Sequence, residues 1–200
     1  MKKLGLILMI LAMGMTGFAQ KSAAPEETGT MSTTHKANAP EWGAEMTTNF
    51  VQKAMMGGMM EKELGQMAVR RGNSQDVKDL GMMLAKNHSN ADMKLEDIAE
   101  DMNISIPDKL DREHQQTLDQ LKLKSDNEFS KAFVNLVIKN HENDIAAFKN
   151  AEDRLPEGKL DEWVENTIPV MQKHLSKAES IKDNWKNCDV KKNEKMNEQK

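Results

Sequence analysis

The sequence predicts an all-α bundle of four long helices, with a long and partly helical crossover between the second and third core helices. Composition is the first reason: 30% of the residues are charged, 4% are aromatic, Tyr is absent, and Met occurs seventeen times. This composition suits helices that pack through adaptable Met side chains, and it suits a β-sandwich badly. The second reason is periodicity, because apolar residues recur at three- and four-residue steps in four long stretches.

The beginning of the chain predicts export. Residues 1–19 combine a charged start, a short apolar run and a Gly-Phe-Ala cleavage site, which is typical of a signal peptide cut after Ala19. No later stretch is long and apolar enough to span a bilayer, so we expect a periplasmic or otherwise exported protein without a transmembrane segment in the mature chain. Residues 20–42, which include His35, lack periodicity and predict a flexible linker.

Charge and cysteine content narrow the classes of partner. Cleavage of the signal peptide would remove two lysines and no acid, which takes the formal net charge from −4 to −6. This balance argues against nucleic-acid binding. The single cysteine, Cys188, excludes an internal disulfide and lies in a charged tail over residues 187–200, where we interpret it as an incidental thiol. An envelope protein partner and the oligomeric state are left open.

The first core helix is predicted over residues 46–71. Its buried stripe comprises Phe50, Ala54, Gly57, Glu61, Leu64 and Ala68. Glu61 in the middle of this stripe needs a partner, because an unpaired carboxylate is costly to bury. Gly57 and Gly58 indicate either a close backbone approach near Glu61 or tight packing against a bulky neighbour, and we favour the second interpretation.

The second core helix is predicted over residues 75–102, with Gly72 ending the first helix and Ser74 as N-cap. Its stripe comprises Val77, Leu80, Leu84, His88, Ala91, Leu95, Ile98 and Met102. Residues 104–126 follow as the crossover, where Pro107 breaks the pattern, Asp108 can cap a shorter helix, and His114 is interpreted as a surface or packing histidine. At helical and extended rises this segment spans about 40 Å, roughly the length of a core helix.

The third core helix is predicted from a capping box at Ser125 to about residue 153, and His141 lies in its stripe. The fourth is predicted over residues 157–186, with His174 in its stripe. Pro169 lies inside this helix, so we expect a kink or bulge just before His174.

Each core helix therefore places one ligand-capable residue in its apolar stripe: Glu61, His88, His141 and His174. Glu61 and His88 are equidistant from the first predicted turn, and His141 and His174 are equidistant from the turn near residues 156–158. The distances are about 20 Å and about 25 Å at the helical rise, and a long crossover puts the two turns at opposite ends. All four residues are then expected to meet near the middle of the bundle.

Two interpretations of this constellation are open. The first is a mononuclear metal site with ligands Glu61, His88, His141 and His174, suited to Fe, Zn or Cu. The second is a buried polar layer that fixes helix register in a non-catalytic cell-envelope stress or interaction protein. Two Glu-x-x-His pairs, the usual di-iron pattern, are missing, and the sequence assigns neither a catalytic residue nor a substrate.

Other residues near the stripes have weaker signals. Asp92 and Asp144 become additional ligands if the helices rotate slightly. The cluster Met55, Met56, Met59 and Met60 indicates core filling, with thioether binding of Cu(I) as the alternative.

Several runs together resemble a family of exported bacterial proteins, the domain of unknown function numbered forty-one forty-two. They are FVQKAMMGGMMEKELGQMA, VKDLGMMLAKNHSNADMKL, HQQTLDQL, FSKAFVNLVIKNHENDIAAF and IPVMQKHLSKAESI. The resemblance implies a ferritin-like four-helix core, here over residues 43–186, periplasmic or outer-membrane placement, and no established biochemistry. It also implies that Glu61, His88, His141 and His174 are the inward polar positions. The family often has Asp at the position before the first histidine, where this chain has Asn87. This difference weakens any proposal in which a carboxylate at that position supports the histidine.

Overall fold

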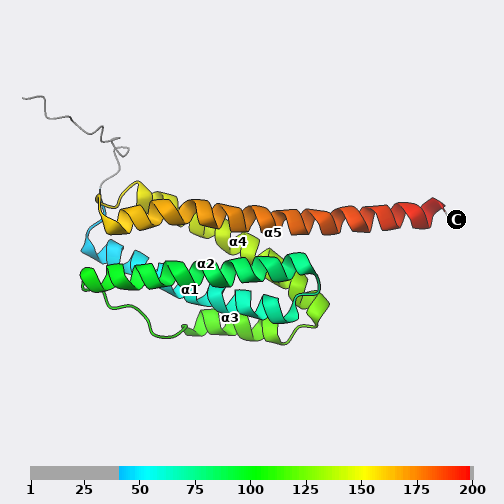
Figure 1. The fold of residues 1–200 in the computed structure, drawn as a ribbon, viewed down its shortest axis with the longest axis horizontal. Coiled ribbons are helices and arrows are strands. Elements are labelled where there is room, and N and C mark those ends of the chain that lie inside the picture. The colour runs from blue at the N-terminus through cyan, green and yellow to red at the C-terminus, as the bar shows by residue number, and fades with distance from the viewer. Residues whose placement is uncertain (1–40, 199–200) are drawn as a thin grey trace, which may run out of the picture. The chain divides into compact units, whose positions relative to one another are not determined.

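The computed structural model describes residues 41–198, and all the regular secondary structure in this range is helical (Figure 1). The helices are α1 (Ala44–Arg71), α2 (Gln75–Asp101), α3 (Arg112–Lys122), α4 (Asp126–Glu152) and α5 (Lys159–Glu198). The predicted signal peptide, His35 and most of the predicted linker lie outside the described residues. The prediction of an all-α bundle with a partly helical crossover is confirmed.

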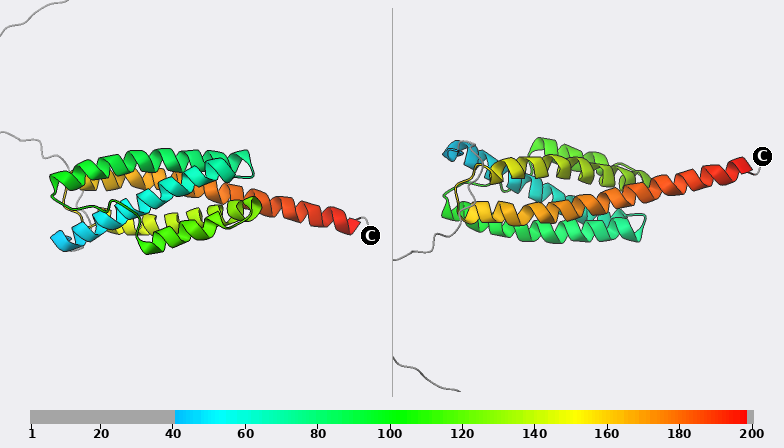
Figure 2. Two further views of the ribbon diagram at one scale, coloured as in Figure 1. Left: turned by 90° about the horizontal axis from the view of Figure 1, so that it is seen from below. Right: turned by 90° about the horizontal axis from the view of Figure 1, so that it is seen from above.

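The four long helices form two hairpins that pack side by side. α1 pairs with α2 and α4 pairs with α5, while α2 also contacts α5 and α1 contacts α4 (Figures 1 and 2). α3 packs on the outside, against α1 and α4, through Leu118 and Leu121. Each long helix therefore contributes one face to a shared core.

The connection between α2 and α4 runs from one end of the bundle to the other. α2 ends beside the start of α5, where Lys159 contacts the carboxylate of Asp101. α4 starts at the opposite end, where Ser130 Oγ accepts the backbone N–H of Asn73 at 3.0 Å in the α1–α2 turn. The two hairpin turns consequently lie at opposite ends of the bundle. This arrangement brings the four predicted polar residues to the same height along it.

Helix starts follow local capping chemistry. Ser74 caps α2, and Ser125 and Glu128 form the predicted capping box of α4. The predicted cap of α3 was wrong: α3 begins after Asp111, whose Oδ1 accepts the His114 N–H at 2.9 Å, and Asp108 lies in the preceding connection. Both aspartates follow Pro107, so local sequence alone did not separate them.

α1 and α2 approach closely at small residues. A Cβ added to Gly65 would lie 2.6 Å from the Gly81 carbonyl oxygen, and one added to Gly81 would lie 2.7 Å from that of Gly65. Gly58 faces Asp92, whose Oδ1 would lie 1.9 Å from an added Cβ, whereas Gly57 has open space. The predicted tight packing is therefore found at Gly58, where the neighbour is the Asp92 side chain, and it is wrong for Gly57.

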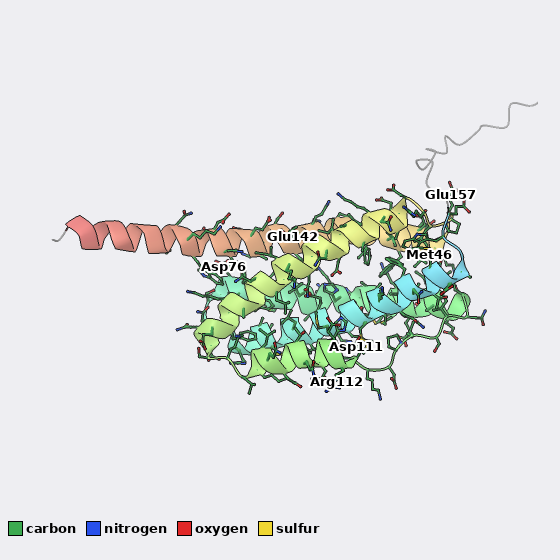
Figure 3. All side chains as sticks on the ribbon, turned by 180° about the vertical axis from the view of Figure 1, so that it is seen from behind. Met46, Asp76, Asp111, Arg112, Glu142 and Glu157 are labelled. Carbon is green, nitrogen blue, oxygen red and sulfur yellow. The ribbon has the colours of Figure 1, made fainter. Side chains whose placement is uncertain are left out.

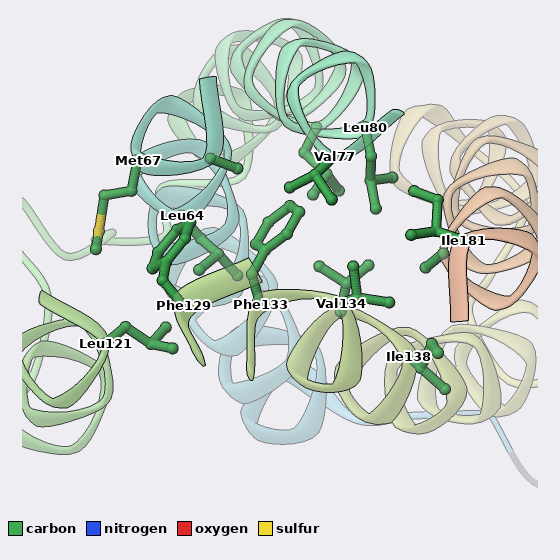
Figure 4. Packing of buried hydrophobic residues seen from close by; sticks show 14 of the residues in the cluster. Leu64, Met67, Val77, Leu80, Leu121, Phe129, Phe133, Val134, Ile138 and Ile181 are labelled. Atoms are coloured by element: carbon green, nitrogen blue, oxygen red, sulfur yellow. The ribbon is translucent and has the colours of Figure 1, made fainter. Parts of the chain in front are cut away.

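The interior consists of two apolar clusters. The first contains Leu64, Val77, Leu80, Phe129 and Phe133, which Figure 4 shows packed together. The second, toward the α4–α5 turn, contains Phe50, Leu95, Phe148 and Trp163. Trp42, predicted to end the flexible linker, packs against Phe50 with ring centroids 5.5 Å apart. His141 lies between Ile138 of the first cluster and Ile145 of the second, so a polar layer divides the core.

α5 contains Pro169 and is longer than predicted. It is α-helical on both sides of Pro169, so the bulge, one of the two expected alternatives, is absent before His174. It also continues to Glu198, through most of the predicted tail, and extends beyond the other helices in Figures 1 and 2. Residues 187–198 contain neither Gly nor Pro, which explains why the helix does not stop. Among the described helices, none combines the length and the apolar character that crossing a membrane requires.

Candidate metal centre

Three of the four predicted residues meet in the polar layer. His88 of α2, His141 of α4 and His174 of α5 each offer a ring nitrogen, and these nitrogens all lie within 4.8 Å of one another. His141 and His174 are each only 1% exposed, and His88 is half-buried. The structure therefore brings three helices together at one histidine cluster.

A chain of hydrogen bonds links two of the histidines to their surroundings. His141 Nδ1 lies 3.0 Å from the Val137 carbonyl oxygen, and His141 Nε2 lies 3.0 Å from His174 Nδ1. His174 Nε2 in turn lies 3.0 Å from Asn87 Nδ2. Every one of these nitrogens has a partner if Asn87 donates to His174, His174 donates to His141, and His141 donates to Val137.

His88 is the one histidine of the cluster that has a ring nitrogen unpartnered among the described residues. Its Nε2 is buried and has no hydrogen-bond partner within residues 41–198. Its ring centroid lies 5.3 Å from that of His174 and 5.8 Å from that of His141. A buried polar atom without a partner costs free energy, and such atoms in native proteins need an explanation. The unpartnered nitrogen of the cluster is thus available to a ligand.

Burial keeps all three imidazoles neutral. Desolvation lowers the pKa of His141 to about 4 and that of His174 to about 3. The pKa of His88 is also well below its ordinary value, first because of burial and second because of repulsion from the charged forms of the other two histidines. Neutral imidazole is the form that binds a metal ion, so the cluster is ready for ligation at neutral pH.

Ligation would require one change of tautomer. An ion bound by His141 Nε2 and His174 Nδ1 needs a lone pair on both nitrogens, so the proton between them must move to His174 Nε2. Asn87 can then accept that proton's hydrogen bond through its amide oxygen after a flip of the amide.

Glu61 lies beside the cluster rather than within it. Its Oε1 accepts from Asn140 Nδ2 at 3.0 Å and lies 4.0 Å from His141 Nδ1, the nitrogen directed to Val137. The side chain is 1% exposed, and burial raises its pKa to about 8. Glu61 is therefore protonated for the most part at neutral pH, and it faces the side of the His141 ring opposite the nitrogen that faces His174.

The weaker candidates lie outside the cluster. Asp92 packs against Gly58, with its Oδ2 3.9 Å from Lys62 Nζ, and burial raises its pKa to about 6. Asp144 is half-buried, and burial raises its pKa to about 6 as well. His114 is bonded to Asp111 at 2.8 Å near the surface, in agreement with its interpretation.

The methionine cluster divides between two environments. Met55 and Met59 pack with the second apolar cluster, whereas Met60 belongs to the first, and Met56 Sδ accepts the Asp111 N–H at 3.2 Å. This division agrees with core filling. Cys188 is exposed.

Two asparagines were missed by reasoning from apolar stripes. Asn87 contacts His174, and Asn140 contacts Glu61, so each reaches a residue of a different helix. A signal was present, since the run Lys-Asn-His-x-Asn occurs at 86–90 and again at 139–143. In both copies the residue before the histidine orients a member of the polar layer.

Comparison with known proteins gives one assignment. A family described as Domain of unknown function (DUF4142) matches residues 32–181, and the chain belongs to this family. The search of curated proteins found no match. The search of solved structures found none either.

Proposed function

We propose that this member of the DUF4142 family is an exported protein that binds one transition-metal ion through His88, His141 and His174. The observation that carries the proposal is the convergence of three neutral imidazoles, one of them with a buried and unpartnered Nε2. Export is supported by the signal-peptide pattern of residues 1–19.

The ligand chemistry favours the imidazole-binding ions Zn, Cu and Fe. The donors are three neutral nitrogens, so the bound ion would keep its full charge and at least one coordination position for water or another ligand. The protein's own contribution is orientation: Val137 accepts from His141, and Asn87 bonds His174. These contacts fix which ring edge faces the centre.

One observation favours the alternative of a non-catalytic envelope protein with a buried polar layer. The chain of hydrogen bonds from Asn87 through His174 and His141 to Val137 needs no ion to be complete. A polar layer of this kind fixes helix register only when its members are satisfied, however, and His88 Nε2 is not. The unpartnered nitrogen therefore decides our preference for the metal site.

The test is the metal content of the protein purified from the periplasm, measured by elemental analysis. We expect about one equivalent of metal in the parent protein and little in a His141→Ala/His174→Ala variant. His114→Ala is the matched control, because His114 lies outside the cluster and should leave the metal content unchanged. A parent protein that stays metal-free after loading with Fe(II), Zn(II) and Cu(I) would support the polar layer.

A further inference from the structure

A second polar site lies on the other side of Glu61. A cleft of about 830 Å³ opens between α1, α4 and the crossover segment with α3. These elements lie on the face that Figure 3 shows, where Asp111 marks the approach to α3 and Glu142 lies on α4. The volume lies within the range of sites that hold small organic molecules.

Glu61 lies in the wall of this cleft and has an unused oxygen. Asn140 occupies Oε1 at 3.0 Å, but Oε2 is buried and has no hydrogen-bond partner in the described part of the chain. The side chain is 1% exposed. A buried polar oxygen of this kind needs a partner, and the cleft is the space from which one can arrive. Burial favours the protonated form of Glu61, and a cation in the cleft would favour its carboxylate and release the proton to solvent.

α4 supplies a second carboxylate and two amides to the same cleft. Asp144 is half-buried and lies one turn after Asn140, and both line the cleft with Asn143. Glu61 and Asp144 are near enough to interact electrostatically. The lysines of the cleft, Lys53 and Lys139, are exposed and can turn toward solvent.

Apolar side chains complete the walls. Met56 and Met60 of α1, Ile106 of the crossover and Leu136 of α4 line the cleft beside the carboxylates. A metal ion does not need such a surface, and the carboxylates are not part of any metal-binding group of three found in the described residues. A ligand with a positive end and a hydrocarbon body fits both parts of the wall.

We propose that this cleft binds a small aliphatic amine, whose ammonium group contacts Glu61 and Asp144 and whose carbon chain lies along Met56 and Leu136. An ammonium group supplies three donors, which serve Glu61 Oε2 and the Asp144 carboxylate together. The cleft adjoins the histidine cluster at Glu61 but is lined by none of the three histidines, and the test uses metal-free protein.

The test is calorimetric titration of the chelator-treated protein with butan-1-amine, which has one ammonium end and a hydrocarbon chain. We expect binding with a Kd below about 1 mM. Butan-1-ol, which has the same length without the charge, should give no saturable heat. The side-chain amide signals of Asn140 and Asn143 should shift in nitrogen–proton NMR spectra when the amine binds, which locates the ligand.

Matched variants assign the contacts. Glu61→Gln and Asp144→Asn keep the shape of each side chain and prevent it from becoming a carboxylate, and each should weaken binding about tenfold or more. Glu142→Gln removes a charge from the exposed side of α4 and should leave binding unchanged. Asp144→Asn tests the proposal even if Glu61→Gln disturbs the fold.

Three outcomes would overturn the proposal. The first is heat no greater than that of the alcohol. The second is unchanged affinity in Asp144→Asn. The third is displacement of the amine by an equal concentration of Mg²⁺, which would make the cleft a site for inorganic cations.

Discussion

Zinc binding by the parent protein should barely respond to a change from about pH 7.5 to about pH 5.5. Three exposed histidines would lose about 1,000-fold in affinity over this range, because each must release a proton with a pKa near 6.5 before it can bind. In the cluster, burial lowers the pKa of His141 to about 4 and that of His174 to about 3, and that of His88 lies well below its ordinary value. All three are deprotonated at both pH values, so we expect a loss of less than about twofold.

The same titration separates two ligand sets. Glu61, predicted from the sequence as a fourth ligand, has a pKa raised to about 8 by burial. If its carboxylate joined the ion, binding would release its proton, and affinity would fall about 80-fold between about pH 7.5 and about pH 5.5. Its position 4.0 Å from His141 Nδ1, on the side of the ring away from His174, predicts the flat profile.

The assay is competition with a chelator of known zinc affinity at each pH, with circular dichroism to verify that the protein stays folded. A loss near 1,000-fold would refute the inference that the histidines are buried and neutral. A loss near 80-fold would keep the cluster and make Glu61 a ligand.

Further predictions concern residues around the centre and the packing that holds it. Asn87→Leu should lower zinc affinity about 10- to 100-fold, because it removes the partner of His174 Nε2. Asn90→Leu, on the exposed side of α2, is the control and should leave the affinity unchanged. Equal affinities in the two variants would show that the Asn87 amide does not orient the His174 ring. Gly65→Ala should lower the free energy of unfolding in urea by at least about 2 kcal/mol, because the added Cβ would press on backbone atoms of α2. Gly57→Ala, which adds a Cβ in open space, should raise it by up to about 1 kcal/mol. Stabilisation by both substitutions would contradict the close approach of the two helices. Arg71→Lys should lower the free energy of unfolding by about 1–3 kcal/mol. The guanidinium donates to the carbonyls of Leu121, Lys122 and Lys124 and lies 4.7 Å from the centroid of the Phe129 ring. An unchanged urea midpoint would mean that these contacts add nothing to stability.

The convergence of the histidines was predictable because helical rise is constant. Residues equidistant from a turn stay level across a hairpin, so His141 and His174 could be paired by counting, and a long crossover brought His88 to the same height. Helix starts were predictable where the chemistry was specific, as at the Ser125 capping box.

Other features depend on rotation and side-chain direction, which counting along a helix does not supply. Glu61 lies at the predicted height, yet its carboxylate faces Asn140 and the far edge of the His141 ring. Asn87 was placed outside the stripe, although its amide reaches inward to His174. The cleft beside Glu61 depends on the route of the crossover, and the part of it between α2 and α3 forms no helix from whose pattern its path could be read.

Anomalous X-ray diffraction from crystals of the zinc-loaded protein tests the central claim most directly. We expect one anomalous peak at the centre of the bundle, about 2.0–2.1 Å from a ring nitrogen of each of His88, His141 and His174. A peak elsewhere, or crystals that take up zinc only at surface carboxylates, would contradict the metal centre.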